Sequence, residues 1–170
     1  MLVANEDSPY IEDIKKFTND NIKLFFAPKN SIMGAIRNIS VDNAKGEYIA
    51  QWDDDNVHHA NRLTAQYNHV KRFDKQACFL RRVLVHDIIT GDKGITKPGR
   101  GIESTIVALK KDLPRYNNNT QYAEDLPART FFQSNGKSAT LDEPQLYIYN
   151  IHNNNSCKYQ NLRSMIDTII

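Results

Sequence analysis

The sequence predicts an α/β fold in which helices flank a mostly parallel sheet. Segments with the two-residue alternation of strands take turns along the chain with segments whose apolar residues recur at helical spacing. The chain of 170 residues is long enough for one hydrophobic core and too short for two domains of ordinary size. Neither a repeat nor a Gly/Ser-rich linker divides it, so we expect residues 1–170 to form a single domain.

The first half of the chain alternates between strand and helix signals. Ser8 is an N-cap residue type and Pro9 suits a first helical position, so a short helix is expected to follow the first strand. Pro28 ends the second strand, and Gly46 precedes the third. The expected elements are a strand at residues 2–4, a helix at 8–17, a strand at 22–26, a helix at 31–44, a strand at 48–52 and a helix at 60–71.

The second half carries shorter signals. Pro127 stands in the first turn of an expected helix, directly after Glu124 and Asp125. The expected elements are strands at residues 78–80 and 83–85, a polar, Gly-rich loop at 87–101, helices at 106–113 and 126–133, a strand at 146–149 and a short amphipathic tail at 162–169.

Composition and charge exclude several function classes. Lys and Arg number 22 against 20 for Asp and Glu, and the formal net charge of +2 gives no basic field of the kind that binds nucleic acid. No apolar run approaches the ~20 residues that span a bilayer, and no charged-then-apolar leader opens the chain, so we expect a cytoplasmic protein. Cys78 and Cys157 fit neither a disulfide framework nor a cysteine zinc site.

Three adjacent carboxylates, Asp53, Asp54 and Asp55, follow the strand at residues 48–52. Like charges this close raise one another's pKa unless a cation joins them. Hard oxygen ligands without a nearby cysteine favour Mg²⁺ or Mn²⁺, so a site for a metal and a diphosphate is expected here. A solvated acidic turn is the competing interpretation, and it is the commoner one for a short motif taken alone. Trp52, beside the run, is expected in the core at the strand end.

Several motifs then occur in a recognisable order. Residues 46–56 read Gly-Glu-Tyr-Ile-Ala-Gln-Trp-Asp-Asp-Asp-Asn and are followed by Asn61-Arg62-Leu63 and Gln66. This stretch resembles the segment of the family 2 glycosyltransferases that carries their Asp-x-Asp motif. Further stretches match that family's order and approximate spacing, namely Arg37-Asn38, Ala44-x-Gly46, residues 100–105, Glu124-Asp125 and Tyr147-x-Tyr149-x-x-His152-x-x-Asn155. The resemblance spans nearly the whole chain.

The resemblance implies a GT-A fold and transfer of a sugar from a nucleotide-sugar donor to an acceptor hydroxyl, with inversion at the anomeric carbon. Asp53 and Asp55 would hold Mn²⁺ or Mg²⁺, which as a Lewis acid neutralises charge on a sugar-diphosphate leaving group. His152 is a further candidate, as a metal ligand or a phosphate contact. Asp125, the second acid of the Glu-Asp pair, would be the catalytic base that takes the proton of the acceptor hydroxyl.

The donor has its own candidate contacts. Similar proteins hold the base and ribose with an Asp-Asp pair after the second strand, and here Asn5 stands in place of the first acid, which leaves Glu6 as the match. The candidate donor contacts are Glu6, Arg37, Asp53 and Asp54. Each functional assignment has a structural alternative: a capped turn at Glu6, a solvent-facing Arg37, a first-turn acid at Asp125 and a surface histidine at His152.

Members of the family normally open with an apolar strand and a helix that form part of the nucleotide pocket, and the resemblance begins after that unit. We therefore expect an N-terminally truncated domain. A catalytically silent remnant that acts as a binding or interaction module is one alternative to the transferase. A glycoside hydrolase that pairs Glu124 or Asp125 with an acid of the 53–55 run is another.

The acceptor stays open at the level of sequence. A saccharide, a lipid-linked molecule or a protein would each serve, because acceptor choice depends on loops such as residues 87–101. A lipid-linked acceptor would bring peripheral contact with a membrane.

Overall fold

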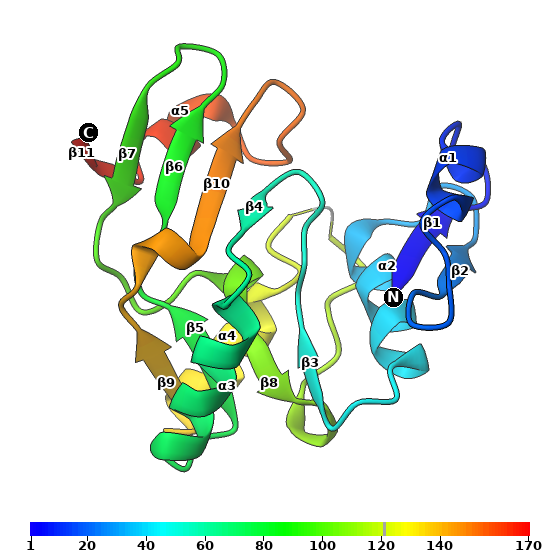
Figure 1. Ribbon diagram of the computed structural model, residues 1–170, viewed down its shortest axis with the longest axis horizontal. Coiled ribbons are helices and arrows are strands. Elements are labelled where there is room, and N and C mark those ends of the chain that lie inside the picture. The colour runs from blue at the N-terminus through cyan, green and yellow to red at the C-terminus, as the bar shows by residue number, and fades with distance from the viewer. Residues whose placement is uncertain (121) are drawn as a thin grey trace.

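The computed structural model describes residues 1–120 and 122–170 and has the predicted α/β architecture (Figure 1). Helices and strands alternate along the first half, and strands predominate after it. The helices are α1 (Ile11–Lys15), α2 (Met33–Asn43), α3 (Arg62–Arg72), α4 (Leu126–Ser134) and α5 (Tyr159–Arg163), with 3₁₀ turns η1 (Glu103–Thr105), η2 (Lys110–Asp112) and η3 (Pro144–Leu146). The strands are β1 (Leu2–Asn5), β2 (Leu24–Ala27), β3 (Tyr48–Ala50), β4 (Val57–His58), β5 (Ala77–Leu80), β6 (Leu84–Asp87), β7 (Lys93–Thr96), β8 (Val107–Leu109), β9 (Ser138–Leu141), β10 (Tyr147–Ile151) and β11 (Ile166–Ile169).

A four-stranded sheet, ordered β3-β8-β5-β9, forms the centre of the molecule. All four residues of β5 are fully buried because side chains on both faces of this strand are covered. Ala77 and Phe79 pack with Ala128 and Phe132 of α4 on one face. On the other face, Gln66 of α3 donates to the backbone carbonyl of Cys78. The two helices therefore sandwich the sheet.

A second sheet, ordered β11-β7-β6-β10-β4, lies beside the first (Figure 1). Its core contains Val85, Ile151 and Leu162, so α5 covers one of its faces. Tyr147, at the start of β10, is fully buried in a cluster with Leu80 of the central sheet. The two sheets therefore share a hydrophobic contact next to the loop that joins β3 and β4.

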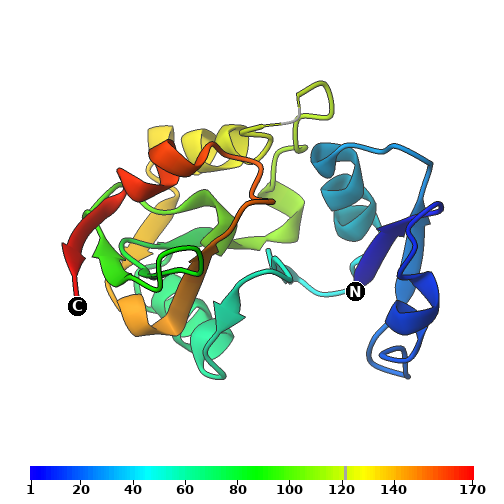
Figure 2. The same ribbon diagram turned by 90° about the horizontal axis from the view of Figure 1, so that it is seen from above.

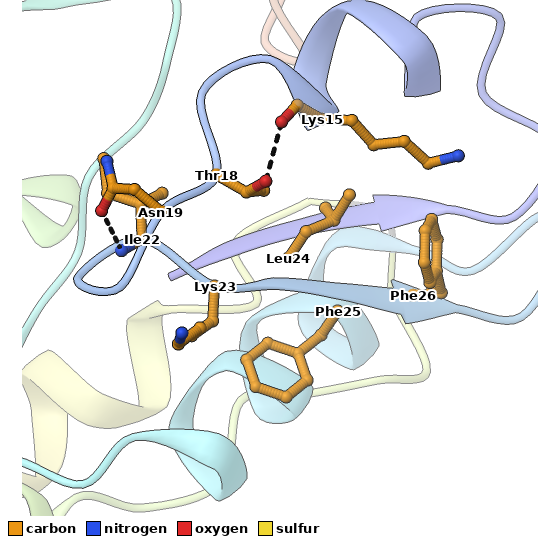
Figure 3. Close-up of a pocket in the computed structure, with 8 residues that line it drawn as sticks. All are labelled: Lys15, Thr18, Asn19, Ile22, Lys23, Leu24, Phe25 and Phe26. Carbon is orange, nitrogen blue, oxygen red and sulfur yellow. Dashed lines mark hydrogen bonds between the residues drawn. The ribbon is translucent and has the colours of Figure 1, made fainter.

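The first two strands form a separate parallel pair, β1-β2, which packs against α2. Figure 2 shows this pair standing apart from the central sheet, with α2 between them on one side. Across residues 1–120 and 122–170, no ladder joins β1 to β3. A pocket of about 460 Å³ between α1 and β2, lined by Lys15, Leu24 and Phe26 among others, lies on this unit and contains none of the candidate site residues (Figure 3).

The ladders are mixed. β1-β2, β5-β9 and β6-β10 are parallel. β8 runs antiparallel to both β3 and β5, and β7 runs antiparallel to β6 and β11. The parallel share is smaller than expected because the sequence analysis did not identify β7 and β8 as strands.

Several expected elements are wrong. The helix expected at residues 106–113 is strand β8 followed by η2, because a continuous apolar run buried on both sides does not distinguish a helix from a strand. The loop expected at 87–101 contains β7, and Gly94 is required there because a Cβ would lie 2.6 Å from the carbonyl oxygen of Thr168. The tail at 162–169 ends α5 and then forms β11, and the sequence analysis missed β4 and β9.

The first helix is shorter than expected. It begins at Ile11, and Ser8 lies in the preceding turn, where its hydroxyl accepts a hydrogen bond from the backbone N–H of Tyr10 at 3.4 Å. In the described part of the chain, no helix has the length and apolar character needed to cross a membrane.

Candidate active site

The candidate residues meet where the segment after β3 passes between α2 and β10 (Figure 1). Gln51 extends the β3 ladder by one hydrogen bond, from its backbone N–H to the carbonyl of Ile106 at 3.1 Å. The chain then leaves the sheet, so Asp53 and Asp55 stand beyond its edge. The start of α4 brings Glu124 and Asp125 to the same place from a distant part of the sequence.

Arg37 of α2 links two acidic segments. Its Nε donates to Glu124 at 2.8 Å, and its Nη1 donates to Asp53 at 2.9 Å. The side chain is only 15% exposed. Burial disfavours the cation, but Asp53, Glu124 and Asp125 outweigh that effect and raise the pKa of Arg37. Arg37 therefore faces the acidic residues and not the solvent.

Asp125 lies at the N-cap position of α4, yet its side chain makes no capping hydrogen bond to any described residue. Burial, together with the neighbouring Glu124, raises the pKa of the Asp125 carboxyl to about 6. The Nε2 of Gln51 lies 3.5 Å from Asp125 and 3.4 Å from both carboxylate oxygens of Asp53. A carboxyl whose pKa lies near neutrality can exchange a proton at physiological pH, which is what a general base requires.

Asp55 and His152 form the third part of the site. His152 Nε2 lies 3.2 Å from Asp55 Oδ2, and both side chains are partly exposed. Asn150 of β10 holds this contact in place, because its side chain donates to the Asp55 carbonyl at 2.7 Å and its backbone N–H donates to Asn56 at 2.9 Å. The loops after β3 and β10 are thus tied together.

The metal-binding residues proposed from the sequence are divided between these contacts. No group of three or more His, Cys, Asp or Glu side chains arranged for a metal occurs among residues 1–120 and 122–170. Asp53 is engaged by Arg37, whereas Asp55 and His152 lie together with exposed surface. The carboxylate of Asp55 is a ligand type that both Mn²⁺ and Mg²⁺ accept, whereas the imidazole of His152 fits a transition metal such as Mn²⁺ better than Mg²⁺, which takes oxygen ligands.

Two candidate donor contacts lie outside this network. Asp54 is exposed between Asp53 and Asp55. Glu6 is exposed in the turn after β1, where its backbone N–H donates to the carbonyl of Ala27 at 3.0 Å. Of the candidate donor contacts, Arg37 and Asp53 are therefore the two that the fold brings together.

Sequence reasoning missed a buried group beneath the acidic run. Trp52 is 52% exposed, contrary to the expected core position, and stacks on His58 with ring centroids 3.9 Å apart. Arg62 of α3 lies below them and is fully buried. The Arg62-Leu63 match was the one sequence signal that drew attention to this position, and it gave no role.

The architecture defines the class of protein: an α/β chain with the GT-A fold, in which acidic residues gather beyond the edge of the central sheet. The family model described as glycosyl transferase family 2 matches residues 4–133. The chain therefore belongs to glycosyl transferase family 2.

Solved structures support the same fold. The 1–349 fragment of S. aureus TarS in complex with UDP-GlcNAc aligns with a TM-score of 0.68 and 13% identity, covering 91% of this chain and 50% of that one. A second structure of the same TarS fragment gives a TM-score of 0.64 and 12% identity, covering 87% of this chain and 50% of that one. S. aureus TarS gives a TM-score of 0.61 and 12% identity, covering 88% of this chain and 30% of that one. This chain thus spans half the length of the TarS fragment, and no curated protein sequence matches it.

Proposed function

We propose that the chain transfers a sugar from a nucleotide-sugar donor to an acceptor hydroxyl, with inversion at the anomeric carbon. Membership of glycosyl transferase family 2 supports the reaction class. The observation that carries the proposal is Asp125, a carboxyl with a pKa of about 6 that Gln51 links to Asp53 of the acidic run. A base of this strength beside a diphosphate-binding run is what direct displacement by a hydroxyl needs.

In this proposal, Asp125 accepts the proton of the acceptor hydroxyl as its oxygen attacks the anomeric carbon. The bond to the diphosphate oxygen breaks on the opposite face, which inverts the configuration. Burial serves Asp125 here because it makes the carboxylate a stronger base than an exposed aspartate. Gln51 donates toward the same carboxylate and orients it.

The donor would lie along the acidic run. Asp53, Asp55 and His152 are the proposed ligands of Mn²⁺ or Mg²⁺, which would neutralise charge on the diphosphate leaving group. Arg37, Asp53 and Asp54 are proposed to contact the donor, and Glu6 its nucleoside. UDP-sugars are the first donors to test, because the matched TarS fragment was solved with UDP-GlcNAc.

Calorimetric titration tests the donor site. The folded chain is titrated with UDP and other nucleoside diphosphates in the presence of Mn²⁺ and again with a chelator. We expect Mn²⁺-dependent binding that Asp55→Ala abolishes and that Asp142→Ala, a change of a surface acid paired with Arg82, leaves intact. A folded chain that binds none of these nucleotides would contradict the proposal and favour a catalytically silent binding module.

A transfer assay tests the chemistry separately. The acceptor panel contains saccharide, lipid-linked and protein acceptors, each incubated with a UDP-sugar that the calorimetry has shown to bind. Sugar transfer that a chelator abolishes supports the metal-dependent mechanism, whereas transfer that persists in the chelator excludes the proposed metal.

A further inference from the structure

We propose that the buried Arg62 is a positioning residue for the acidic run and acts through His58, which holds the backbone of Asp53. The proposal deepens the proposed function, since the run it positions is the one assigned to the donor.

Arg62 donates to three uncharged acceptors. Its Nη2 bonds the backbone carbonyl of Gln51 at 2.9 Å, its Nε bonds the side-chain oxygen of Gln66 at 3.0 Å, and its Nη1 contacts His58 Nδ1. The side chain is 0% exposed. A guanidinium group offers only donors, so Nδ1 of His58 must be the acceptor in this contact.

That contact fixes the state of the His58 ring. With Nδ1 accepting, the proton of the neutral imidazole lies on Nε2. Nε2 in turn lies 2.9 Å from the backbone carbonyl of Asp53 and donates to it. Arg62 therefore holds the backbone on both sides of Trp52. It bonds the carbonyl of Gln51 directly, and it reaches the carbonyl of Asp53 through His58.

The same group is tied to the central sheet. Gln66 donates to the carbonyl of Thr105 at 2.8 Å and to that of Cys78, in β5, at 3.2 Å. All four residues of β5 are fully buried. The acidic run lies beyond the sheet, but Arg62 and Gln66 connect it by hydrogen bonds to the buried strand β5.

A purely packing role does not explain a buried cation at this position. Removing a guanidinium from water is unfavourable, and an apolar side chain of similar volume fills such a space at less expense. The rings of Trp52 and Tyr147, 5.3 and 5.4 Å from the Arg62 guanidinium carbon, offset part of that penalty. The remaining gain lies in the directed bonds to Gln51 and His58, which fix the backbone of the run.

Two substitutions of His58 separate the two bonds of its ring. His58→Asn keeps a δ-position acceptor for Arg62 but is too short to reach the Asp53 carbonyl, whereas His58→Gln keeps an ε-position donor for that carbonyl. His69→Asn, the same change at an exposed histidine of α3, is the matched control. Arg62→Lys is a further variant, because one ammonium group cannot satisfy three separated acceptors.

The first readout is hydrogen exchange of the segment 49–57, measured by mass spectrometry, and it needs no activity. We expect His58→Asn and Arg62→Lys to speed exchange there by up to ~10-fold, the equivalent of about one hydrogen bond. His58→Gln keeps the donor to Asp53 but loses the acceptor for Arg62, so it should speed exchange by less than His58→Asn, and His69→Asn should leave it within about twofold of the parent chain. Parent-like exchange in His58→Gln would show that Arg62 does not act through His58. Unchanged exchange in His58→Asn would overturn the positioning role, whatever the chain binds.

The second readout is Mn²⁺-dependent affinity for UDP. We expect His58→Asn to weaken it by ~10-fold and His58→Gln to weaken it by less, with both variants folded. A His58→Asn variant that exchanges faster but binds UDP as tightly as the parent would show that the run is held for some other purpose. A parent chain that binds no UDP, with exchange responding as expected, would overturn the proposed donor site and leave the positioning role in place.

Discussion

Asp125 is a partly buried carboxyl that must lose its proton before it can act as the proposed base. Its pKa of about 6 lies above the ordinary value for aspartate because burial and Glu124 both disfavour the carboxylate. The proton must leave before the side chain can act as a base. We therefore expect kcat/KM for sugar transfer to rise with pH through about 6 and then to level off. A pH profile with no rise between about pH 5 and 7 would contradict Asp125 as the base.

The raised pKa of Asp125 also makes the stability of the fold depend on pH. A folded-state pKa raised above the unfolded value stabilises the fold below the unfolded pKa of about 4, and this contribution disappears as the pH rises through about 6. Asp125→Asn copies the protonated form, so it should raise the free energy of unfolding by roughly 3 kcal/mol at pH 8 and by almost nothing at pH 4. Urea unfolding at the two pH values measures this difference. Equal effects at both would rule out the raised pKa, while loss of transfer in the stabilised variant would support a catalytic role.

Arg37 is the residue on which the site's charges depend. Its guanidinium group forms ion pairs with the carboxylates of both Asp53 and Glu124, and its side chain is only 15% exposed. Arg37→Met leaves both carboxylates without it and should lower the free energy of unfolding by ~3 kcal/mol at pH 7.5. Arg37→Lys should lose less, since an ammonium group can pair with one of them. Thermal unfolding compares the variants with Arg82→Met, which removes an exposed pair and should cost little.

Residue types predicted part of the site. The fold brings Asp53, Asp125 and Arg37 together, because Arg37 pairs with Asp53 and the side chain of Gln51 lies between Asp53 and Asp125. Glu6 stays in an exposed turn. His58 and Arg62 were missed because each contacts a backbone carbonyl, and a sequence does not show which carbonyl a side chain will meet. Gln51 was missed because Asp125, one of its partners, lies 74 positions away in the sequence.

Among elements, each strand that was missed has at least one pairing partner that is distant in the sequence. Residues 93–96 and 138–141 carry weak alternation, but β7 pairs with β6 and β11, and β9 completes the edge of β5. Helices α2, α3 and α4 were predicted to within two residues at each end, since their signals are local. Strand formation depends on pairing with other parts of the chain, whereas the helices can be predicted from the local spacing of apolar residues.

The β1-β2 pair makes few packing contacts with the rest of the fold. It is a two-stranded ladder whose helical cover is α2, and such a pair is marginal without further packing. We expect its backbone amides to exchange hydrogen at least ~100-fold faster than those of β5, which is buried on both faces. Exchange mass spectrometry of peptides covering residues 2–5 and 77–80 measures the ratio, and equal protection would show that the pair and the central sheet unfold together.

At the scale of the whole molecule, the fold extends past the segment that the family model matches. That match ends at residue 133, before β9, β10 and His152. Yet β9 pairs with β5 in the central sheet, and β10 lies between β6 and β4 in the second. The proposed pairing of Asp55 with His152 joins residues 97 positions apart, so the site also needs this last part.

A chain that ends at Ser134 should therefore fail to fold. Loss of residues 135–170 would expose the edge of β5 and remove Tyr147, which is fully buried against Leu80 and lies next to His58. Circular dichroism should show no cooperative thermal unfolding for the shortened chain. Removing only residues 166–170 deletes the edge strand β11 and should leave a cooperative transition at lower temperature, because the central sheet keeps all its pairings. If the 134-residue chain instead unfolds cooperatively near the parent's midpoint, the fold does not need residues 135–170, and the contact between Asp55 and His152 would join these residues to a unit that folds without them.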